Sequence, residues 1–433
     1  MPSPPQQSTR GPKNALHTAA FLGSIRSTQA LLSQGSFDVN QGCEDGATPL
    51  MLASYNDSPG VVRALLDAGA AVSIAKDDGI TALFSAADSG SLAVTKMLAE
   101  AGADLEAPVI DGGTSLHVAA EEGHTAVISA LVEAGAKTGS RRRDGATPLY
   151  LAARTWRAEA VRVLLRAKAD PLLPFMNHGS GQMFIPLDSA AMFGHSDVVR
   201  ELLGQVGIRG CGGPTRGYNA FRMASLNQHV GVMAMLTDAG VVDTGEALLN
   251  AVQHGHEAAA KFLVKKFGGV AGRGRAYVDA RDAKDRGPLQ LSLEACRPCS
   301  PRIARLLIDA GANTRTPVRV DTDRSIAFIT PLIYATRLRN YKKRHSNIVS
   351  EQQWHTFEAI RTLLVREAAV HATSWVWPRV VSSTARSGRT ETPSTSLGAM
   401  LPILRRRNES RRRALVRTMF RHSSKKDRDS PTG

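Results

Sequence analysis

Cysteine, aromatic residues and long hydrophobic runs are all scarce in this chain of 433 residues. Four cysteines are too few for a disulfide framework and favour a reducing compartment. Aromatic residues make up 5% of the chain, so the core must consist mainly of Ala, Leu, Val and Ile, which suits close-packed helices. No apolar run approaches the roughly 20 residues of a membrane span, and the polar N-terminus lacks the apolar region of a secretory signal. We therefore expect a cytoplasmic or nuclear protein that is not secreted and has no transmembrane segment.

The positive charge of the chain is concentrated near its end. The net charge is +15, and residues 376–433 contain 14 Lys or Arg and 4 Asp or Glu. This segment therefore carries +10, whereas the other 375 residues together carry only +5. The small charge of the body does not indicate a dedicated nucleic-acid-binding surface. The tail, in contrast, is a segment that can contact anions.

A period of 33 residues governs the body of the chain. Four segments align without gaps, and their threonines are Thr48, Thr81, Thr114 and Thr147. Weaker copies of the pattern begin near residues 14, 185, 219, 246, 287 and 330, which makes ten units of varying length. Such a period is the signature of a repeat architecture, in which each unit buries its apolar face against its neighbours.

The unit at residues 111–143 predicts two helices and an extended finger. Asp111-Gly112 favours a turn, Thr114 can cap the first helix, and Gly123 can end it in a left-handed conformation. An apolar stripe at helical spacing is formed by Leu116, Ala119 and Ala120. We predict an all-α fold, an α-solenoid of about ten helix-turn-helix repeats with short β-hairpin-like fingers. It is expected at residues 14–374, between a disordered N-terminus (1–13) and a disordered, basic, Ser/Thr/Arg-rich tail (375–433).

These motifs resemble ankyrin repeats. The family signature is similar to Thr114-Ser-Leu-His117-Val-Ala-Ala and to Asn14-Ala-Leu-His17-Thr-Ala-Ala. A Gly-His step between helices occurs at Gly123, Gly194 and Gly255. The resemblance is most specific at 45–165, and insertions make it looser at 171–374. It implies a scaffold that holds a protein partner on its fingers and inner helices, and a repeat without catalysis.

The sequence offers little chemistry for an enzyme. The resemblance implies structural positions for the repeated histidines, in which they bond to backbone or Thr. Cys296 and Cys299 form a Cys-x-x-Cys pair, but Cys43 and Cys211 lie in distant units and do not complete a zinc site. No phosphate-binding, nucleophile-elbow or kinase motif occurs. We expect a non-enzymatic protein without metal or cofactor.

Two fingers and one turn hold the candidate partner-binding residues. Arg141, Arg142 and Arg143 replace an ordinary finger tip, and they indicate either an acidic or phosphorylated partner or a solvated tip. The next finger (Pro171 to Phe184) is longer than the others, and its apolar side chains either fold back or contact a partner: Phe175, Met176, Met183 and Phe184. Trp156 stands where the glycine of the Gly-His step is expected, and it is either an interface anchor or a cover for the neighbouring finger.

The tail contains a second candidate site. Its two Arg triplets are Arg405, Arg406, Arg407 and Arg411, Arg412, Arg413. Several interpretations stay open: a nuclear-import signal, a basic amphipathic helix for calmodulin-like proteins or an anionic membrane, non-specific RNA contact, and a tail without a specific role.

The sequence as a whole favours a protein–protein interaction scaffold or adaptor, monomeric by itself, whose partner is a protein of unknown identity. The alternative is a regulator that contacts nucleic acid or an anionic membrane mainly through the tail.

Overall fold

The computed structural model describes residues 14–177, 179, 181–268, 274–295, 300–314, 318–322, 325–329, 355 and 358–367. The chain divides into two units, residues 1–366 and 367–433. The described structure belongs to the first unit, apart from Glu367. The predicted disordered N-terminus, the pair Cys296 and Cys299, and the tail with its six candidate arginines lie outside the described residues.

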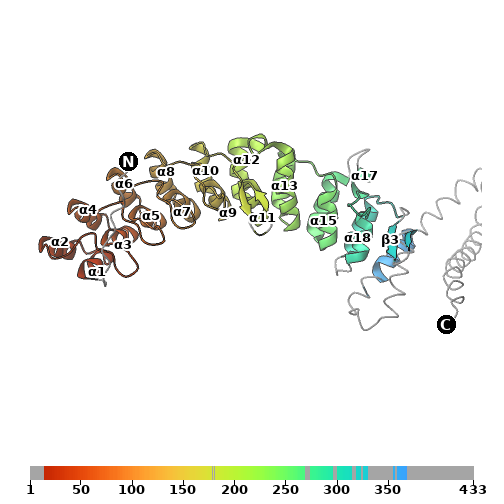
Figure 1. Ribbon diagram of the computed structural model, residues 1–433. Helices are drawn as coiled ribbons and strands as arrows, with labels where there is room; N and C mark the ends of the chain where they lie inside the picture. Colours follow the sequence, from red (N-terminus) through yellow and green to blue (C-terminus); the bar gives the residue numbers. More distant parts are fainter. Residues whose placement is uncertain are drawn as a thin grey trace, which may run out of the picture. The chain divides into compact units, whose positions relative to one another are not determined.

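Nine helix pairs follow one another in chain order over the described part of the first unit (Figure 1). The first five pairs are α1 (Ala15–Phe21) and α2 (Ile25–Ser33), α3 (Pro49–Tyr55) and α4 (Pro59–Asp67), α5 (Ala82–Asp88) and α6 (Leu92–Glu100), α7 (Ser115–Glu122) and α8 (Thr125–Glu133), and α9 (Pro148–Arg154) and α10 (Ala158–Arg166). The other four are α11 (Pro186–Phe193) and α12 (Ser196–Gly210), α13 (Gly213–Leu226) and α14 (Val230–Asp238), α15 (Glu246–His254) and α16 (Glu257–Leu263), and α18 (Pro288–Ala295) and α19 (Ser300–Asp309).

The smaller elements lie at the fingers and in the last units. The hairpin β1 (Phe175–Asn177) and β2 (Gln182–Phe184) lies between α10 and α11. A π-helical turn (Val264–Gly268) and α17 (Gly274–Val278) follow α16, and a second hairpin is formed by β3 (Val318–Thr322) and β4 (Ser325–Ile329). Residues 358–367 are helical. The prediction of an all-α solenoid with hairpin-like fingers is therefore confirmed.

The helices form two layers. The first helix of each pair (the inner helix) packs against the inner helices of the neighbouring pairs, and the second helices (the outer helices) pack against one another in the same way. Pairs of alanines on the first helices are fully buried, among them Ala86 and Ala87, Ala119 and Ala120, and Ala152 and Ala153. Since alanine lets backbones approach closely, one apolar core continues through the stacked pairs from α1 to α19.

The predicted local signals act as caps. The Thr48 and Thr147 hydroxyls accept a backbone N–H in the first turn of α3 and α9, each of which begins with a proline. Gly123 ends α7 at a φ of 84°. The His117 ring bonds to Thr114 at its Nδ1 and to the Ala146 carbonyl of the next unit at its Nε2. Burial lowers the pKa of His117, so this ring is neutral at pH 7 and holds neighbouring units together.

Two buried threonines weaken the outer layer, and their replacement gives a stability prediction. The fourth residue of the outer helices is Val62, Ile128 or Val161 in three units, but Thr28 and Thr95 in two others. Both threonine hydroxyls are buried without a hydrogen-bond partner in the described structure. We expect Thr95→Val to raise the free energy of unfolding by about 1 kcal/mol, because the isosteric methyl removes an unsatisfied hydroxyl. Urea denaturation checks this, and a lower midpoint for the variant would contradict it.

Candidate functional site

Backbone hydrogen bonds join four neighbouring finger tips, from the second finger at Asp78 to the fifth, which is the β1–β2 hairpin. In each of the first four fingers a turn closes on an Asp-Gly pair, and the Asp carboxylate accepts the backbone N–H two residues later, as at Asp111 and Asp144. The fingers then bond to their neighbours: Ile110 N–H donates to Asp78 O at 2.8 Å, Arg143 N–H to Asp111 O at 2.8 Å, and Met176 N–H to Asp144 O at 3.0 Å. The fifth finger, the β1–β2 hairpin, is therefore held in register with the fourth.

The inner face of this hairpin is locked onto the core. Phe175 and Phe184 are partners in the antiparallel register, and residues directly opposite on a hairpin share a face. Phe184 is buried against Tyr150 and Met223, and the Phe175 ring stacks on Tyr150 with 4.7 Å between ring centroids. Of the two interpretations for Phe175, the structure places this side chain in the folded-back position.

The outer face of the same hairpin presents two methionines. Met176 and Met183 are also cross-strand partners, and because side chains alternate along a strand they point away from the face of Phe175 and Phe184. Met176 is 39% exposed and Met183 is 57% exposed. A rigid hairpin therefore displays a pair of flexible, polarizable side chains, a type of surface that adapts well to partners.

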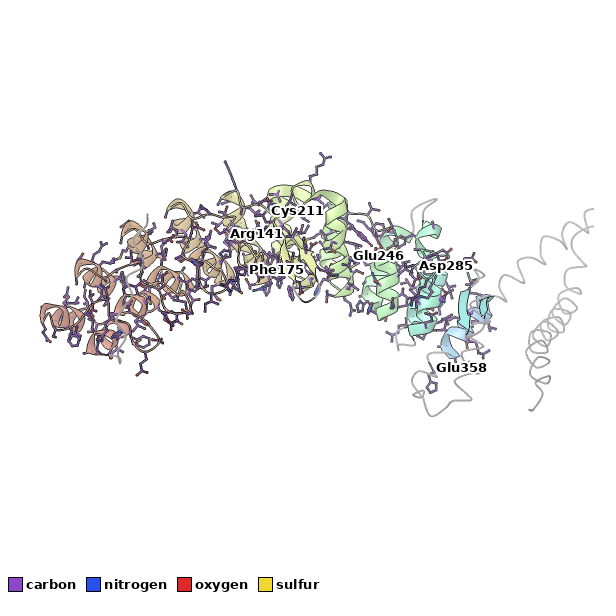
Figure 2. The ribbon with its side chains drawn as sticks, viewed as in Figure 1. Arg141, Phe175, Cys211, Glu246, Asp285 and Glu358 are labelled. Atoms are coloured by element: carbon purple, nitrogen blue, oxygen red, sulfur yellow. The ribbon has the colours of Figure 1, made fainter. Side chains whose placement is uncertain are left out.

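The arginine triplet divides into one inward and two outward side chains. Arg142 pairs with Asp111 and, at 3.6 Å, with Glu121 at the end of α7, so it stabilises the solenoid. Arg141 and Arg143 are exposed, and Arg141 Nη2 donates a 2.8 Å hydrogen bond to the Pro174 carbonyl, next to the hairpin (Figure 2). Arg141 thus contacts the segment that leads into the hairpin, and Arg143 precedes Asp144, whose carbonyl accepts the Met176 N–H.

Trp156 lies at the opposite end of α9, in the turn to α10. The equivalent position has a left-handed backbone in eight helix pairs, and the other seven residues are Gly23, Asp57, Gly90, Gly123, Gly194, Gln228 and Gly255. Trp156 adopts a φ of 64°, a conformation that is strained for a bulky residue. It nevertheless remains 62% exposed. The predicted glycine position is therefore occupied by an exposed aromatic residue.

The Trp156 ring lies on the next repeat and not on the neighbouring finger. It stacks on His195 with 5.9 Å between centroids and 8° between planes, and Phe193 stacks on the same imidazole from α11. His195 Nε2 bonds to the Arg154 carbonyl, which fixes the ring. Trp156, His195 and Phe193, here called the aromatic edge, thus form a continuous surface across two repeats.

Comparison with known families matches two overlapping parts of the chain, residues 16–109 and 106–174, to the family model of ankyrin repeats (3 copies). Residues 16–174 are therefore ankyrin repeats. Ankyrin repeats generally mediate protein–protein interaction, and the family is typically non-enzymatic. The match ends at residue 174, immediately before the β1–β2 hairpin.

One curated relative is cortactin-binding protein 2 of Ornithorhynchus anatinus. It is 39% identical over 62 residues, which cover 14% of this chain and 4% of the relative. The ankyrin-repeat chain therefore corresponds to a small part of that protein.

In the Gly-His step of the ankyrin repeats, the histidine side chain connects one helix pair to the preceding pair. Three histidine rings each bond through Nε2 to a carbonyl at the end of the inner helix of the preceding helix pair. These are His124, His195 and His229. In the unit where Trp156 replaces glycine, Arg157 replaces histidine, and its Nε donates to the equivalent Glu121 carbonyl at 3.1 Å. The step therefore keeps its bond between repeats, and the tryptophan is not needed for it.

Two substitutions of Trp156 separate the energetic cost of the left-handed backbone from the contribution of the exposed ring. A left-handed backbone costs about 1–2 kcal/mol for a residue with a Cβ and little for glycine. We expect Trp156→Gly to unfold close to the wild type and Trp156→Ala to be about 1 kcal/mol less stable than Trp156→Gly. Thermal or urea denaturation measures both variants. Equal stabilities for the glycine and alanine variants would contradict strain at this position.

The sequence did not single out Phe193 as a candidate, and it did not pair Met183 with Met176. Met183 is separated from Met176 by the hairpin turn, and only the cross-strand register brings them together. Phe193 replaces the polar or small residues Asn56, Ser89, Glu122 and Thr155 of the aligned units, and an alignment at the 33-residue period could have revealed it.

The described structure contains no group of three or more His, Cys, Asp or Glu that could hold a metal ion. Burial raises the pKa of Cys211 to about 12, so this thiol stays protonated. Among the described residues, no helix is long and apolar enough to cross a membrane.

Proposed function

We propose that this ankyrin-repeat protein is a non-enzymatic scaffold or adaptor whose fourth and fifth fingers bind a protein partner. The observation that carries the proposal is the two-sided hairpin. Its inner face is fixed by Phe184 and by the Phe175–Tyr150 stack, and its outer face exposes Met176 and Met183. A preorganised surface loses little conformational freedom on binding.

The chemistry of the finger surface defines the partner class. The exposed Arg141 and Arg143 lie on the fourth finger, which is hydrogen-bonded to the methionine hairpin, and arginine recognises carboxylate and phosphate groups through its planar fork. The surface therefore fits a segment that places apolar side chains beside an acidic or phosphorylated group. Arg142, which already pairs with Asp111, has a supporting role and positions the finger.

The aromatic edge is a second contact area in this proposal. It lies beyond the other end of α9, a helix of seven residues with a length of about 10 Å. A partner lying across the inner helices can therefore reach both the methionine pair and Trp156. Tryptophan is enriched among the residues that dominate binding energy, which supports this role.

The test is affinity capture of the full chain from nuclease-treated lysate, followed by quantitative mass spectrometry. The variant Met176→Asp/Met183→Asp changes only exposed side chains. The matched control is Val242→Asp, a substitution of another exposed aliphatic residue (63% exposed) that follows α14. We expect the hairpin variant to lose a specific protein at least about tenfold, a change of about 1.4 kcal/mol, and the control to retain it. Equal recovery by both variants would contradict the proposed site.

A further inference from the structure

One link between successive helix pairs is too short to hold a finger. Residues 68–81, 101–114 and 134–147 connect the helix pairs from α3 to α10, and each of these links contains a finger tip. Residues 239–245, which connect α14 to α15, are half as long. This described link therefore contains no finger tip, although the link before α18 contains one again.

The finger before α18 has the same turn as the earlier fingers. In the turns at 282–286 and at 109–113, the first backbone N–H donates to the carbonyl of the fifth residue, at 3.0 Å and 2.8 Å respectively. The fourth residue is left-handed in both turns, with a φ of 59° at Asp285 and of 85° in the third finger. The second residue of the turn, Ala283, therefore corresponds to Ile110.

The backbone N–H of Ala283 has no acceptor among the described residues. At the same position of the third and fourth fingers, the N–H groups of Ile110 and Arg143 each donate to a carbonyl of the preceding finger at 2.8 Å. Ala283 is exposed, and the short link 239–245 provides no preceding finger to accept this bond. A free donor is therefore present where a neighbouring finger would lie.

A pocket of about 560 Å³ lies at this place, between α15 and the finger before α18. Ala283 is one of its lining residues, and Figure 2 labels Glu246 at the start of α15 and Asp285 on the finger. The buried residues that line it are apolar, among them Leu249 and Leu291. Pockets of roughly 300–1,000 Å³ are typical of ligand sites. The missing finger therefore leaves a pocket of ligand size beside the inner helices.

The charged residues that line the pocket already have polar partners. Asp282 pairs with Arg286 at 2.8 Å, Arg281 donates to the Asp285 carbonyl at 2.7 Å, and Glu246 accepts from the Tyr218 hydroxyl at 3.0 Å. In contrast, the neutral side-chain amides of Asn250 and Gln253, which lie one turn apart on α15, make no hydrogen bond to the described residues. The unused donors and acceptors of the pocket are thus neutral, which favours a neutral polar ligand over an ion.

We propose that this pocket binds an extended peptide segment of a protein partner, which takes the place of the missing finger. A carbonyl of the peptide accepts the Ala283 N–H, as a carbonyl of the preceding finger does elsewhere. A side-chain amide offers both a donor and an acceptor, so Asn250 and Gln253 match the N–H and C=O groups of a peptide backbone. An aliphatic side chain of the peptide packs on Leu249 and Leu291. The β1–β2 hairpin lies outside this pocket, so the peptide site is separate from the proposed partner site.

Peptides selected against the full chain from a random phage-displayed library are the probe, and fluorescence anisotropy measures their affinity. Ala283→Pro removes the N–H at the second residue of a turn, a position that favours proline. Ala283→Ser is the matched control, because it keeps the N–H. We expect the proline variant to bind a selected peptide about fivefold more weakly and the serine variant to stay within about twofold of the wild type. Asn250→Ala/Gln253→Ala should weaken binding about tenfold.

Hydrogen exchange locates the bound peptide. The peptide should protect residues 276–287, and Met176→Asp/Met183→Asp should bind it like the wild type. Binding that requires the methionine pair would overturn the peptide pocket and leave the proposed partner site intact. Selection that yields no peptide, protection outside α15 to α18, or equal affinity of the proline and serine variants would also overturn the proposal.

Discussion

Replacing Asp243 by alanine should lower the free energy of unfolding of the repeats around α15 by about 3 kcal/mol. The Asp243 side chain is buried, and it accepts hydrogen bonds from the Tyr277 hydroxyl at 2.6 Å, the Tyr218 hydroxyl at 3.3 Å and the Ala247 backbone N–H at 3.2 Å. These groups belong to α13, α15 and α17, so one carboxyl group connects three successive units. Alanine would leave the buried Tyr277 hydroxyl without its acceptor.

Phenylalanine variants provide the control for this prediction. Burial and the nearby Asp243 charge raise the pKa of Tyr277, so its hydroxyl stays protonated at neutral pH and donates a hydrogen bond to Asp243. Tyr277→Phe removes one donor and leaves Asp243 with two others, and it should cost about 1.5 kcal/mol. Hydrogen exchange should show the loss of protection in α13 to α17 while α3 to α8 stay protected, since repeats interact mainly with their neighbours. A cost below about 1 kcal/mol for Asp243→Ala would contradict the role of this carboxyl group.

Replacing Phe184 by alanine should cost about 3 kcal/mol and also abolish partner binding. Phe184 is 7% exposed and packs with Tyr150, Leu151 and Met223, so its removal leaves a cavity beneath the hairpin. The hairpin would then lose the apolar contacts that fix the position of the methionine pair.

Met183→Ala is the matched substitution on the other face of β2. Its side chain is exposed, so the free energy of unfolding should change by less than about 0.5 kcal/mol while partner binding weakens. Stability comes from denaturation, and hairpin order comes from hydrogen exchange of residues 174–186. If Phe184→Ala bound the partner as well as the wild type, the fixed hairpin would not be the recognition element.

Regular spacing made most of the fold predictable. The 33-residue steps at Thr48, Thr81, Thr114 and Thr147 place each helix start, and the caps follow from single residues such as Pro148 and Gly123. The sequence also predicted that Trp156 occupies a position where a glycine is expected, because the 33-residue period aligns it with the glycine of the Gly-His step. These features depend on local conformation, which repeats with the sequence.

Contacts between repeats were less predictable. Nothing in the sequence distinguished Arg142, which pairs with Asp111, from its exposed neighbours Arg141 and Arg143. The face of the hairpin on which the Phe175 side chain lies depends on the register of the two strands. The Asp243 cluster lies where the units change length and the Asp-Gly-x-Thr motif is absent, so no alignment indicated it.

The central claim is that the fourth and fifth fingers recognise a protein partner. Hydrogen exchange of the full chain with and without the captured partner tests it most directly. The proposed site predicts new protection at residues 141–145 and 174–186, with protection of the first three repeats unchanged by the partner. Protection confined to residues 376–433, or to repeats that contain neither Arg143 nor Met183, would contradict the claim.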